Sequence, residues 1–199
     1  MSADQETIDI YNKYISDYEE LISKDFKDTN LDIFMEMIGG DGKVLDLGCG
    51  TGSASLELLR KGFSVFPVDA SFEMIKVAES LLNIKARNVS FDEIREHNFY
   101  HAIWANFSLL HITKKQFSDI LKNLFFTLKD DGILFFSLKR GAGESRDKLG
   151  RFYSYYEKDE VEKYLEKANF QTKTYTQGFS LGLAGYKEEW MGFFCQKIL

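Results

Sequence analysis

The chain has 199 residues, of which 44% are hydrophobic and 28% are charged, and its formal net charge is −6. A chain of this length buries about 70% of its unfolded surface when it folds, so we expect one domain with a single core over residues 1–199. The composition excludes a disordered or collagen-like protein. The acidic charge argues against a stable nucleic-acid partner, because binding to phosphates needs a concentrated basic surface.

No apolar run approaches the roughly 20 residues that a membrane span needs, and the first ten residues, MSADQETIDI, lack the features of a signal peptide. We therefore expect a cytoplasmic protein with no membrane partner. The two cysteines, Cys49 and Cys195, are too few for a disulfide framework, and no cluster of Cys and His has zinc-site spacing, so no metal site is expected. The Phe-rich composition is explained by a filled core and leaves the oligomeric state open.

Short apolar runs rich in β-formers alternate with helical patterns, which is typical of βαβ units around a parallel sheet. Apolar and aromatic side chains at spacings of three and four predict a helix over residues 5–37. Further helices are expected at 54–61, from an N-cap at Ser71 to about 82, at 114–128 after an N-cap at Thr113, and at about 157–168. Strands are predicted at 43–47, 64–68, 88–91, 101–105, 133–138, 170–177 and 189–197.

This order predicts a Rossmann-like α/β fold, with a seven-stranded, mostly parallel sheet, an antiparallel C-terminal strand and helices on both faces. Ligands of such sheets bind beyond the carboxyl ends of the central strands. Pro67 stands inside the second strand, where its missing N–H predicts a bulge.

Three glycines at alternate positions, Gly48, Gly50 and Gly52, follow the first strand and precede a helix. Glycine permits positive φ and a close approach of the backbone to a ligand. A dinucleotide site would have G-x-G-x-x-G, but Ser53 stands where its third glycine belongs, so NAD is disfavoured. A phosphate loop is also disfavoured, because no Gly-Lys-Ser/Thr follows.

With Asp46 two residues before Gly48, the run from Val44 to Gly52 resembles motif I of the class I S-adenosylmethionine-dependent methyltransferases. The local sequence is similar to the type 11/12 group, which includes tellurite-resistance-type small-molecule enzymes. The resemblance implies S-adenosylmethionine as cofactor and S-adenosylhomocysteine as product. The charge of the cofactor agrees with this, because a net positive ligand suits a carboxylate at a strand end.

The resemblance also implies roles for individual residues. Asp69, at the end of the second strand, would accept the two ribose hydroxyls, a geometry that dinucleotide sites share. Ala70 and Met74 would lie against the adenine, and Asp92 with the Glu93 amide would bind its amino group. Asp92 as an ordinary turn residue and Met74 as a core residue are the alternatives. The expected cofactor-binding residues are Tyr11, Tyr18, Asp46, Gly48, Cys49, Gly50, Gly52, Asp69, Ala70, Met74, Asp92, Glu93 and Asn106.

The run from Trp104 to His111 resembles the family's motif IV, which lies next to the methyl donor. Asn106 and His111 are therefore the candidate catalytic residues, Asn106 as a ligand of cofactor or acceptor and His111 as a general base. The alternative for His111 is a packing role at the start of a helix. Residues 1–38 are expected to form a helical lid that carries Tyr11 and Tyr18, with an ordinary core stripe as the alternative.

Residues 139–153 are glycine-rich and hold more Lys and Arg than Asp and Glu. We interpret this segment as a substrate loop in which Lys139, Arg151 and the nearby Tyr155 contact the acceptor. Its basic excess favours an anionic acceptor, and a solvated loop is the alternative.

The predicted function is methyl transfer by direct displacement to a small-molecule acceptor. Methylation of a tRNA base or of a protein, a non-catalytic cofactor-binding partner subunit, and a dehydrogenase remain as alternatives. The sequence does not identify the acceptor.

Overall fold

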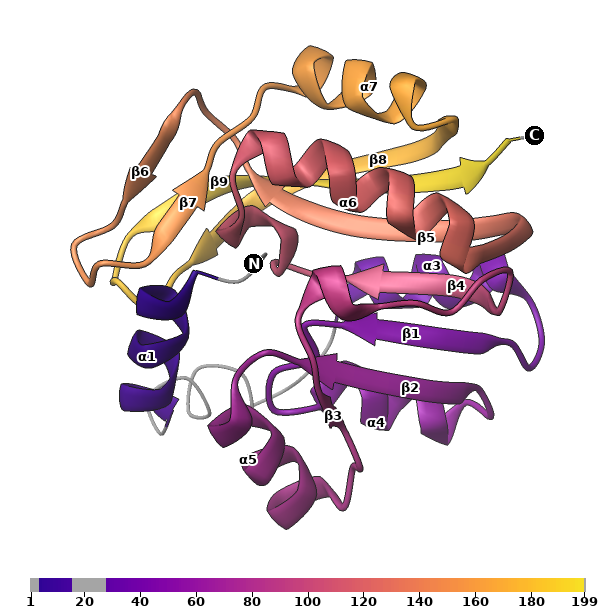
Figure 1. The fold of residues 1–199 in the computed structure, drawn as a ribbon, viewed down its shortest axis with the longest axis horizontal. Helices are drawn as coiled ribbons and strands as arrows, with labels where there is room; N and C mark the ends of the chain where they lie inside the picture. The colour runs from indigo at the N-terminus through magenta and orange to yellow at the C-terminus, as the bar shows by residue number, and fades with distance from the viewer. Residues whose placement is uncertain (1–3, 16–27, 199) are drawn as a thin grey trace.

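A computed structural model describes residues 4–15 and 28–198 of the chain (Figure 1). The helices are α1 (Gln5–Lys13), α3 (Thr29–Ile38), α4 (Ser53–Arg60), α5 (Phe72–Leu82), α6 (Lys114–Thr127) and α7 (Lys158–Lys167), with short 3-10 turns η1 (Phe91–Glu93) and η2 (Leu109–His111). The strands of the main sheet are β1 (Lys43–Leu47), β2 (Ser64–Asp69), β3 (Arg87–Asn88), β4 (Tyr100–Ala105), β5 (Leu128–Lys139), β8 (Phe170–Leu181) and β9 (Lys187–Lys197). A separate hairpin consists of β6 (Glu144–Arg146) and β7 (Phe152–Ser154).

The main sheet has seven strands in the order β3-β2-β1-β4-β5-β9-β8. Strands β3, β2, β1, β4 and β5 run parallel to their neighbours, whereas β9 is antiparallel to both β5 and β8. This topology confirms the predicted fold, including the antiparallel C-terminal strand. The carboxyl ends of β1, β2 and β4 point toward α1, so the ligand-binding edge predicted for such a sheet lies there (Figure 1).

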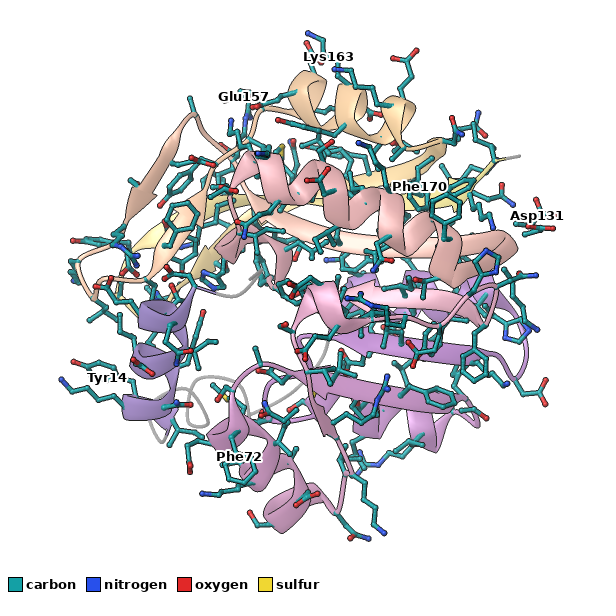
Figure 2. The ribbon with its side chains drawn as sticks, in the orientation of Figure 1. Tyr14, Phe72, Asp131, Glu157, Lys163 and Phe170 are labelled. Atoms are coloured by element: carbon teal, nitrogen blue, oxygen red, sulfur yellow. The ribbon has the colours of Figure 1, made fainter. Side chains whose placement is uncertain are left out.

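Two apolar clusters cover the two faces of the sheet. Phe34 of α3 and Leu58 of α4 pack with Trp104 and Phe135, whose rings stack at 4.2 Å. On the other face, α6 and α7 bury a larger cluster around Phe117. Figure 2 shows charged side chains that point outward from the surface, in contrast to the apolar clusters inside. Those labelled there are Asp131, Glu157 and Lys163. The two apolar clusters hold the sheet from both faces, and with it the carboxyl ends of β1, β2 and β4.

The predicted helix starts at Ser71 and Thr113 are confirmed. The Ser71 hydroxyl accepts a hydrogen bond from the amide of Met74 at 3.1 Å, which caps α5. Thr113 forms a reciprocal capping box with Gln116 at the start of α6. Both caps satisfy backbone amides that have no partner within the helix.

The predicted single helix over 5–37 is wrong. Helix α1 ends at Lys13, and a new helix begins at Thr29, because Asp28 has an extended backbone and caps the amide of Asn30 at 2.9 Å. Tyr18, which was expected on the lid, lies outside the described residues.

Three strand predictions need correction. The third strand is only Arg87–Asn88, because a capping box between Ser90 and Glu93 turns the next residues into η1. Strand β5 follows α6 directly and begins at Leu128, five residues earlier than predicted. Pro67 pairs in regular register with Asp46, so β2 has no bulge there.

The predicted substrate loop contains a β-hairpin that the sequence did not reveal. Strands β6 and β7 pair antiparallel, with Ser145 opposite Tyr153. In Figure 1 the hairpin lies on one side of α1 and α5 lies on the other. Among the described residues, no helix is long and apolar enough to cross a bilayer.

Candidate active site

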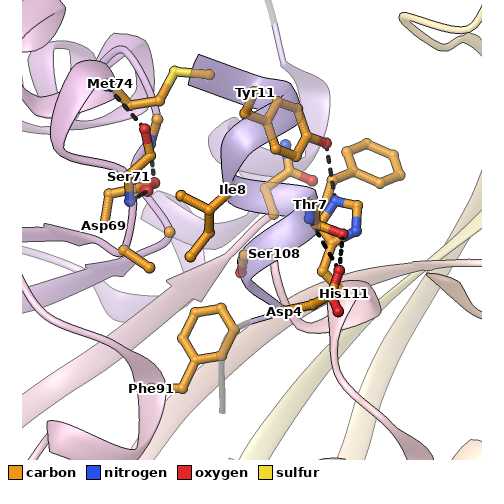
Figure 3. A pocket seen from close by; sticks show the side chains of 15 residues that line it. Asp4, Thr7, Ile8, Tyr11, Asp69, Ser71, Met74, Phe91, Ser108 and His111 are labelled. Carbon is orange, nitrogen blue, oxygen red and sulfur yellow. Dashed lines mark hydrogen bonds between the residues drawn. The ribbon is translucent and has the colours of Figure 1, made fainter. Parts of the chain in front are cut away.

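A cavity that is partly open to solvent lies at the carboxyl ends of β1, β2 and β4, beneath α1. Figure 3 shows Asp69, Ser71 and Met74 on one side and Asp4, Thr7 and His111 on the other, with Ile8 between them. The described residues that line it are Asp4, Thr7, Ile8, Tyr11, Gly48, Gly50, Asp69, Ala70, Ser71, Met74, Phe91, Asn106, Phe107, Ser108 and His111.

The glycine loop turns sharply between β1 and α4. Gly48 and Gly52 have φ values of 81° and 85°, a left-handed conformation that disfavours residues with a side chain. The amides of Gly48 and Cys49 both donate to the Val68 carbonyl at 2.9 Å, which ties the loop to the end of β2. A Cβ atom at position 48 would lie 2.4 Å from the Cβ of Ser108. Gly48 therefore keeps this part of the cavity open.

Asp69 is an acidic residue of the cavity wall, at the end of β2. One of its carboxylate oxygens accepts from the Gly50 amide at 2.8 Å and the other from the Ser71 amide at 2.7 Å. Burial raises the pKa of this carboxyl, while the amides lower it. An ionised carboxylate offers about four lone-pair sites, more than its backbone amides occupy, so acceptor capacity remains for a ligand. The predicted ribose-binding residue is thus held in place by the glycine loop on one side and the start of α5 on the other.

Asp46 does not line the cavity. Its side chain is buried behind the loop and accepts a hydrogen bond from the Ser55 hydroxyl at 2.5 Å, which anchors the first turn of α4. Burial raises the pKa of Asp46 to about 7. Asp46 was expected to face the ligand together with Asp69. In the structure Asp46 supports the glycine loop and does not line the cavity.

Replacing Asp46 with Asn is expected to raise stability at high pH. The pKa of Asp46 is about 7 in the folded chain, above its ordinary value of 3.8, so the folded state holds a proton that the unfolded state loses between these values. The wild type loses stability as pH rises through this window, by up to about 4 kcal/mol. Asn cannot ionise and still accepts from Ser55. Urea unfolding at pH 4.5 and 8 measures this, and an equal difference between the two proteins at both pH values would contradict it.

The turn after β4 combines strain with an unpaired hydroxyl. Asn106 donates to Asp28 at 3.0 Å and accepts from the Ser137 hydroxyl at 2.6 Å, so its amide is fixed at the cavity wall. Phe107 has a φ of 51°, which is uncommon for a residue with a side chain. The buried Ser108 hydroxyl has no hydrogen-bond partner among the described residues. Strain and unpaired buried polar groups are features of ligand sites.

His111 is neutral in this cavity. Its Nδ1 lies 2.7 Å from the Phe152 carbonyl, which only accepts, so we assign the ring proton to Nδ1. Its Nε2 then accepts from the Tyr11 hydroxyl at 2.9 Å. Burial lowers the pKa of His111 to about 3. The lone pair that a general base would use is thus occupied by Tyr11 in the structure.

The ring protons of His111 should show no titration between pH 8 and pH 5 by NMR. Burial disfavours the imidazolium, and the folded pKa lies below the ordinary value of 6.5. Protonation therefore favours the unfolded state, and the stability contributed by His111 is lost as pH falls below 6.5. A His111→Gln protein assigns the resonance. A midpoint near 6.5 for that resonance would show that the ring is not buried as described.

The predicted acceptor residues lie beside the cavity and do not line it. Lys139 forms an ion pair with Glu188, and Arg151 forms one with Asp147 at 2.7 Å. Tyr155 lies beside Gly141, where a Cβ atom would be 3.3 Å from that of Tyr155.

Besides Asp46, four described residues that were predicted to bind the cofactor stand outside the lining: Cys49, Gly52, Asp92 and Glu93. Asp92 accepts from the Ser90 hydroxyl at 2.7 Å, and Glu93 accepts from the Ser90 amide at 2.7 Å, so both residues serve η1. Cys49 is in the glycine loop, and burial raises the pKa of its thiol. Phe91, which directly precedes Asp92, lines the cavity wall, whereas Asp92 does not.

Several lining residues were not predicted. Ile8 is on the apolar face predicted for the first helix, and Ser71 was recognised only as a cap. The signal for Ser108 is its place directly after the motif IV asparagine, but no pattern announces a hydroxyl without a partner. The other unpredicted lining residues are Asp4, Thr7, Phe91 and Phe107. The described residues hold no group of three or more His, Cys, Asp or Glu that fits a metal ion.

A family model described as "Methyltransferase domain" matches residues 14–175, most of the chain. Together with this fold, the match shows that the chain belongs to the class I S-adenosylmethionine-dependent methyltransferases, as its motifs predicted. The cofactor of this family is S-adenosylmethionine.

An uncharacterized methyltransferase of Staphylococcus carnosus (strain TM300) is 27% identical over 137 residues, which are 65% of this chain and 66% of that relative. The match thus spans just under two thirds of the relative's length. The structure of a Burkholderia thailandensis 1,6-didemethyltoxoflavin-N1-methyltransferase has a TM-score of 0.76 and 17% identity, covering 100% of this chain and 92% of its own. TehB from Haemophilus influenzae has a TM-score of 0.70 and 19% identity, covering 90% and 67%. At these identities, the two structures show the fold alone.

Proposed function

We propose that this chain transfers a methyl group from S-adenosylmethionine to a small-molecule acceptor by direct displacement. The observation that carries the proposal is the Asp69 carboxylate, which faces the cavity at the carboxyl ends of the strands, beside the side-chain-free Gly48. A half-buried carboxylate with acceptor capacity left suits the paired hydroxyls of a ribose and a ligand of net positive charge.

The residues present fit this cofactor. Asp69 would hold the ribose, and Ala70, Met74 and Phe91 provide an apolar wall for the adenine. The amino-acid end would lie along Gly48 toward the turn after β4. There the Ser108 hydroxyl, buried without a partner among the described residues, gains one when a polar ligand is present.

When bound, the cofactor supplies a methyl group that is already activated by its sulfonium. The chain therefore needs mainly to align the acceptor and to exclude water. Ile8 and Tyr11 of α1 cover the cavity for this purpose. Asn106, fixed by Asp28 and Ser137, orients the acceptor or the cofactor. His111 Nε2 accepts a hydrogen bond from Tyr11, so its lone pair is occupied. Acceptors that attack without first losing a proton need no general base.

A small acceptor suits a cavity that α1 covers better than a base within a folded tRNA or a protein side chain does. The charges of the loop argue for an uncharged acceptor, because Lys139 and Arg151 are each paired with a carboxylate. The Burkholderia thailandensis neighbour was solved with the small molecule 1,6-didemethyltoxoflavin, which supports this class.

Calorimetric titration with S-adenosylmethionine, S-adenosylhomocysteine and NADH tests the cofactor, and we expect saturable binding of the first two. Release of S-adenosylhomocysteine in the presence of a panel of uncharged and anionic metabolites then tests the acceptor. Binding of NADH alone would favour a dehydrogenase and overturn the proposal. Cofactor binding without turnover on metabolites, tRNA or protein would favour a non-catalytic partner subunit.

A further inference from the structure

Arg151 is a buried cation with three kinds of partner. Only 2% of its surface is exposed. Its Nη2 and Nε atoms donate to the Asp147 carboxylate at 2.7 and 3.0 Å, and its Nη1 donates to the Tyr11 hydroxyl at 3.1 Å. The guanidinium also lies over the rings of Tyr11 and Tyr153, at 5.2 and 5.3 Å from their centres. The loop between β6 and β7 thus supplies an ion pair that contacts the Tyr11 side chain of α1.

The hydrogen bond from Arg151 fixes the direction of the next one. A guanidinium has donors only, so the Tyr11 oxygen must accept from it. The single Tyr11 proton is then available for Nε2 of His111, 2.9 Å away, which is the acceptor nitrogen of that ring. The pair of Asp147 and Arg151 therefore orients both Tyr11 and the neutral His111 at the cavity wall.

Helix α1 also contacts the β6–β7 hairpin on one side and the start of α5 on the other. The Phe152 amide of β7 donates to the Thr7 hydroxyl at 2.8 Å, and Arg146 of β6 forms an exposed ion pair with Asp4. On the opposite side, the Ser71 hydroxyl donates to Asn12 at 2.6 Å. Helix α1 lines the cavity between these two sides, so a loosened α1 would let a ligand leave more readily. The contacts of Arg151 are the most buried of these ties.

We infer that Arg151, held by Asp147, is a positioning residue that latches α1 over the cavity through Tyr11 and touches neither cofactor nor acceptor. The inference rests on the proposed function only in naming what the cavity holds. Arginine suits this task because its planar fork makes several bonds at once and stacks on aromatic rings. The role differs from the acceptor contact that the sequence predicts for Arg151.

Hydrogen exchange of the α1 amides, residues 5–13, tests the latch without any ligand. In a folded Arg151→Met protein these amides should exchange about 10-fold faster, because a hydrogen bond from a charged group and its stacking on Tyr11 are lost. The amides of α6 should not change. Arg140→Met is the matched control, since Arg140 pairs with Glu157 and Glu189 and its paired groups are not on α1.

The dissociation rate of S-adenosylhomocysteine, followed by stopped flow, gives a second readout. Arg151→Met and Tyr11→Phe should each speed dissociation by about 10-fold, whereas Arg140→Met should leave it unchanged. In the double variant the two effects should multiply less than fully, because both variants remove the hydrogen bond between Arg151 and Tyr11. Tyr11→Phe removes only a hydroxyl, so it tests the latch even if Arg151→Met does not fold.

Unchanged exchange of the α1 amides in both variants would overturn the inference. Effects of Arg151→Met and Tyr11→Phe that multiply fully in the double variant would also overturn it, because they would indicate separate roles. Failure of the wild type to bind S-adenosylhomocysteine would overturn the proposed function instead, and the exchange experiment would still decide the latch.

Discussion

An Asp69→Asn protein is expected to bind S-adenosylhomocysteine at least about 100-fold more weakly than the wild type does. Hydrogen bonds to a charged group each contribute about 1.5–3 kcal/mol, and under the proposed function the carboxylate accepts from the hydroxyls of the ribose. Asn keeps the shape of the side chain and one acceptor oxygen, but its amide nitrogen would face the amide of Gly50 or Ser71. Calorimetry at pH 7.5 measures the loss.

Loss of the loop must be separated from loss of the ligand contact. Asp69 also holds the Gly50 and Ser71 amides, so the thermal unfolding midpoint of the variant has to be recorded alongside. Asp119→Asn is a suitable control, because Asp119 is exposed on α6 and pairs only loosely with Lys122 at 3.7 Å. A folded Asp69→Asn protein with wild-type affinity would remove Asp69 from the cofactor site and with it the main support for the proposed function.

The parts of this molecule that the sequence predicts are those set by neighbours in the chain. Ser71 caps α5 through the amide three residues ahead, and the turn at Gly48 follows directly from a backbone that needs positive φ. Asp69 is recognisable because the end of a parallel strand must lie at the ligand-binding edge. Local chemistry and one rule of topology together predict about half of the residues that line the cavity.

The sequence does not reveal features that depend on contacts outside the local segment. Arg151 looks like a ligand for an anion when only its own segment is considered, but its partner on α1 is Tyr11, 140 residues earlier. Asp46 carries the family's acidic position, yet a hydroxyl nine residues later, on Ser55, takes its side chain away from the cavity. Burial and pairing of this kind are decided by tertiary packing, which spacing along the chain does not encode.

A Gly48→Ala substitution should both destabilise the folded chain and weaken its binding of the cofactor. Its φ of 81° costs a residue with a side chain about 1–2 kcal/mol, and the added Cβ would lie 2.4 Å from that of Ser108. Overpacking of this kind costs about 1–3 kcal/mol more. For a chain of this length we expect the unfolding midpoint to fall by roughly 5–15 °C. The new methyl group would also occupy cavity space beside Ser108, so binding of S-adenosylhomocysteine should weaken at least about 10-fold.

Gly62→Ala distinguishes strain from collision. Gly62 has a φ of 94°, but nothing lies within 4 Å of a Cβ atom added there, so this variant should lose only the strain energy of about 1–2 kcal/mol. It should bind S-adenosylhomocysteine as the wild type does, because it follows α4 and does not line the cavity. If Gly48→Ala lost no more stability than Gly62→Ala and kept full affinity, the close approach of the glycine loop to Ser108 would not be what keeps the cavity open.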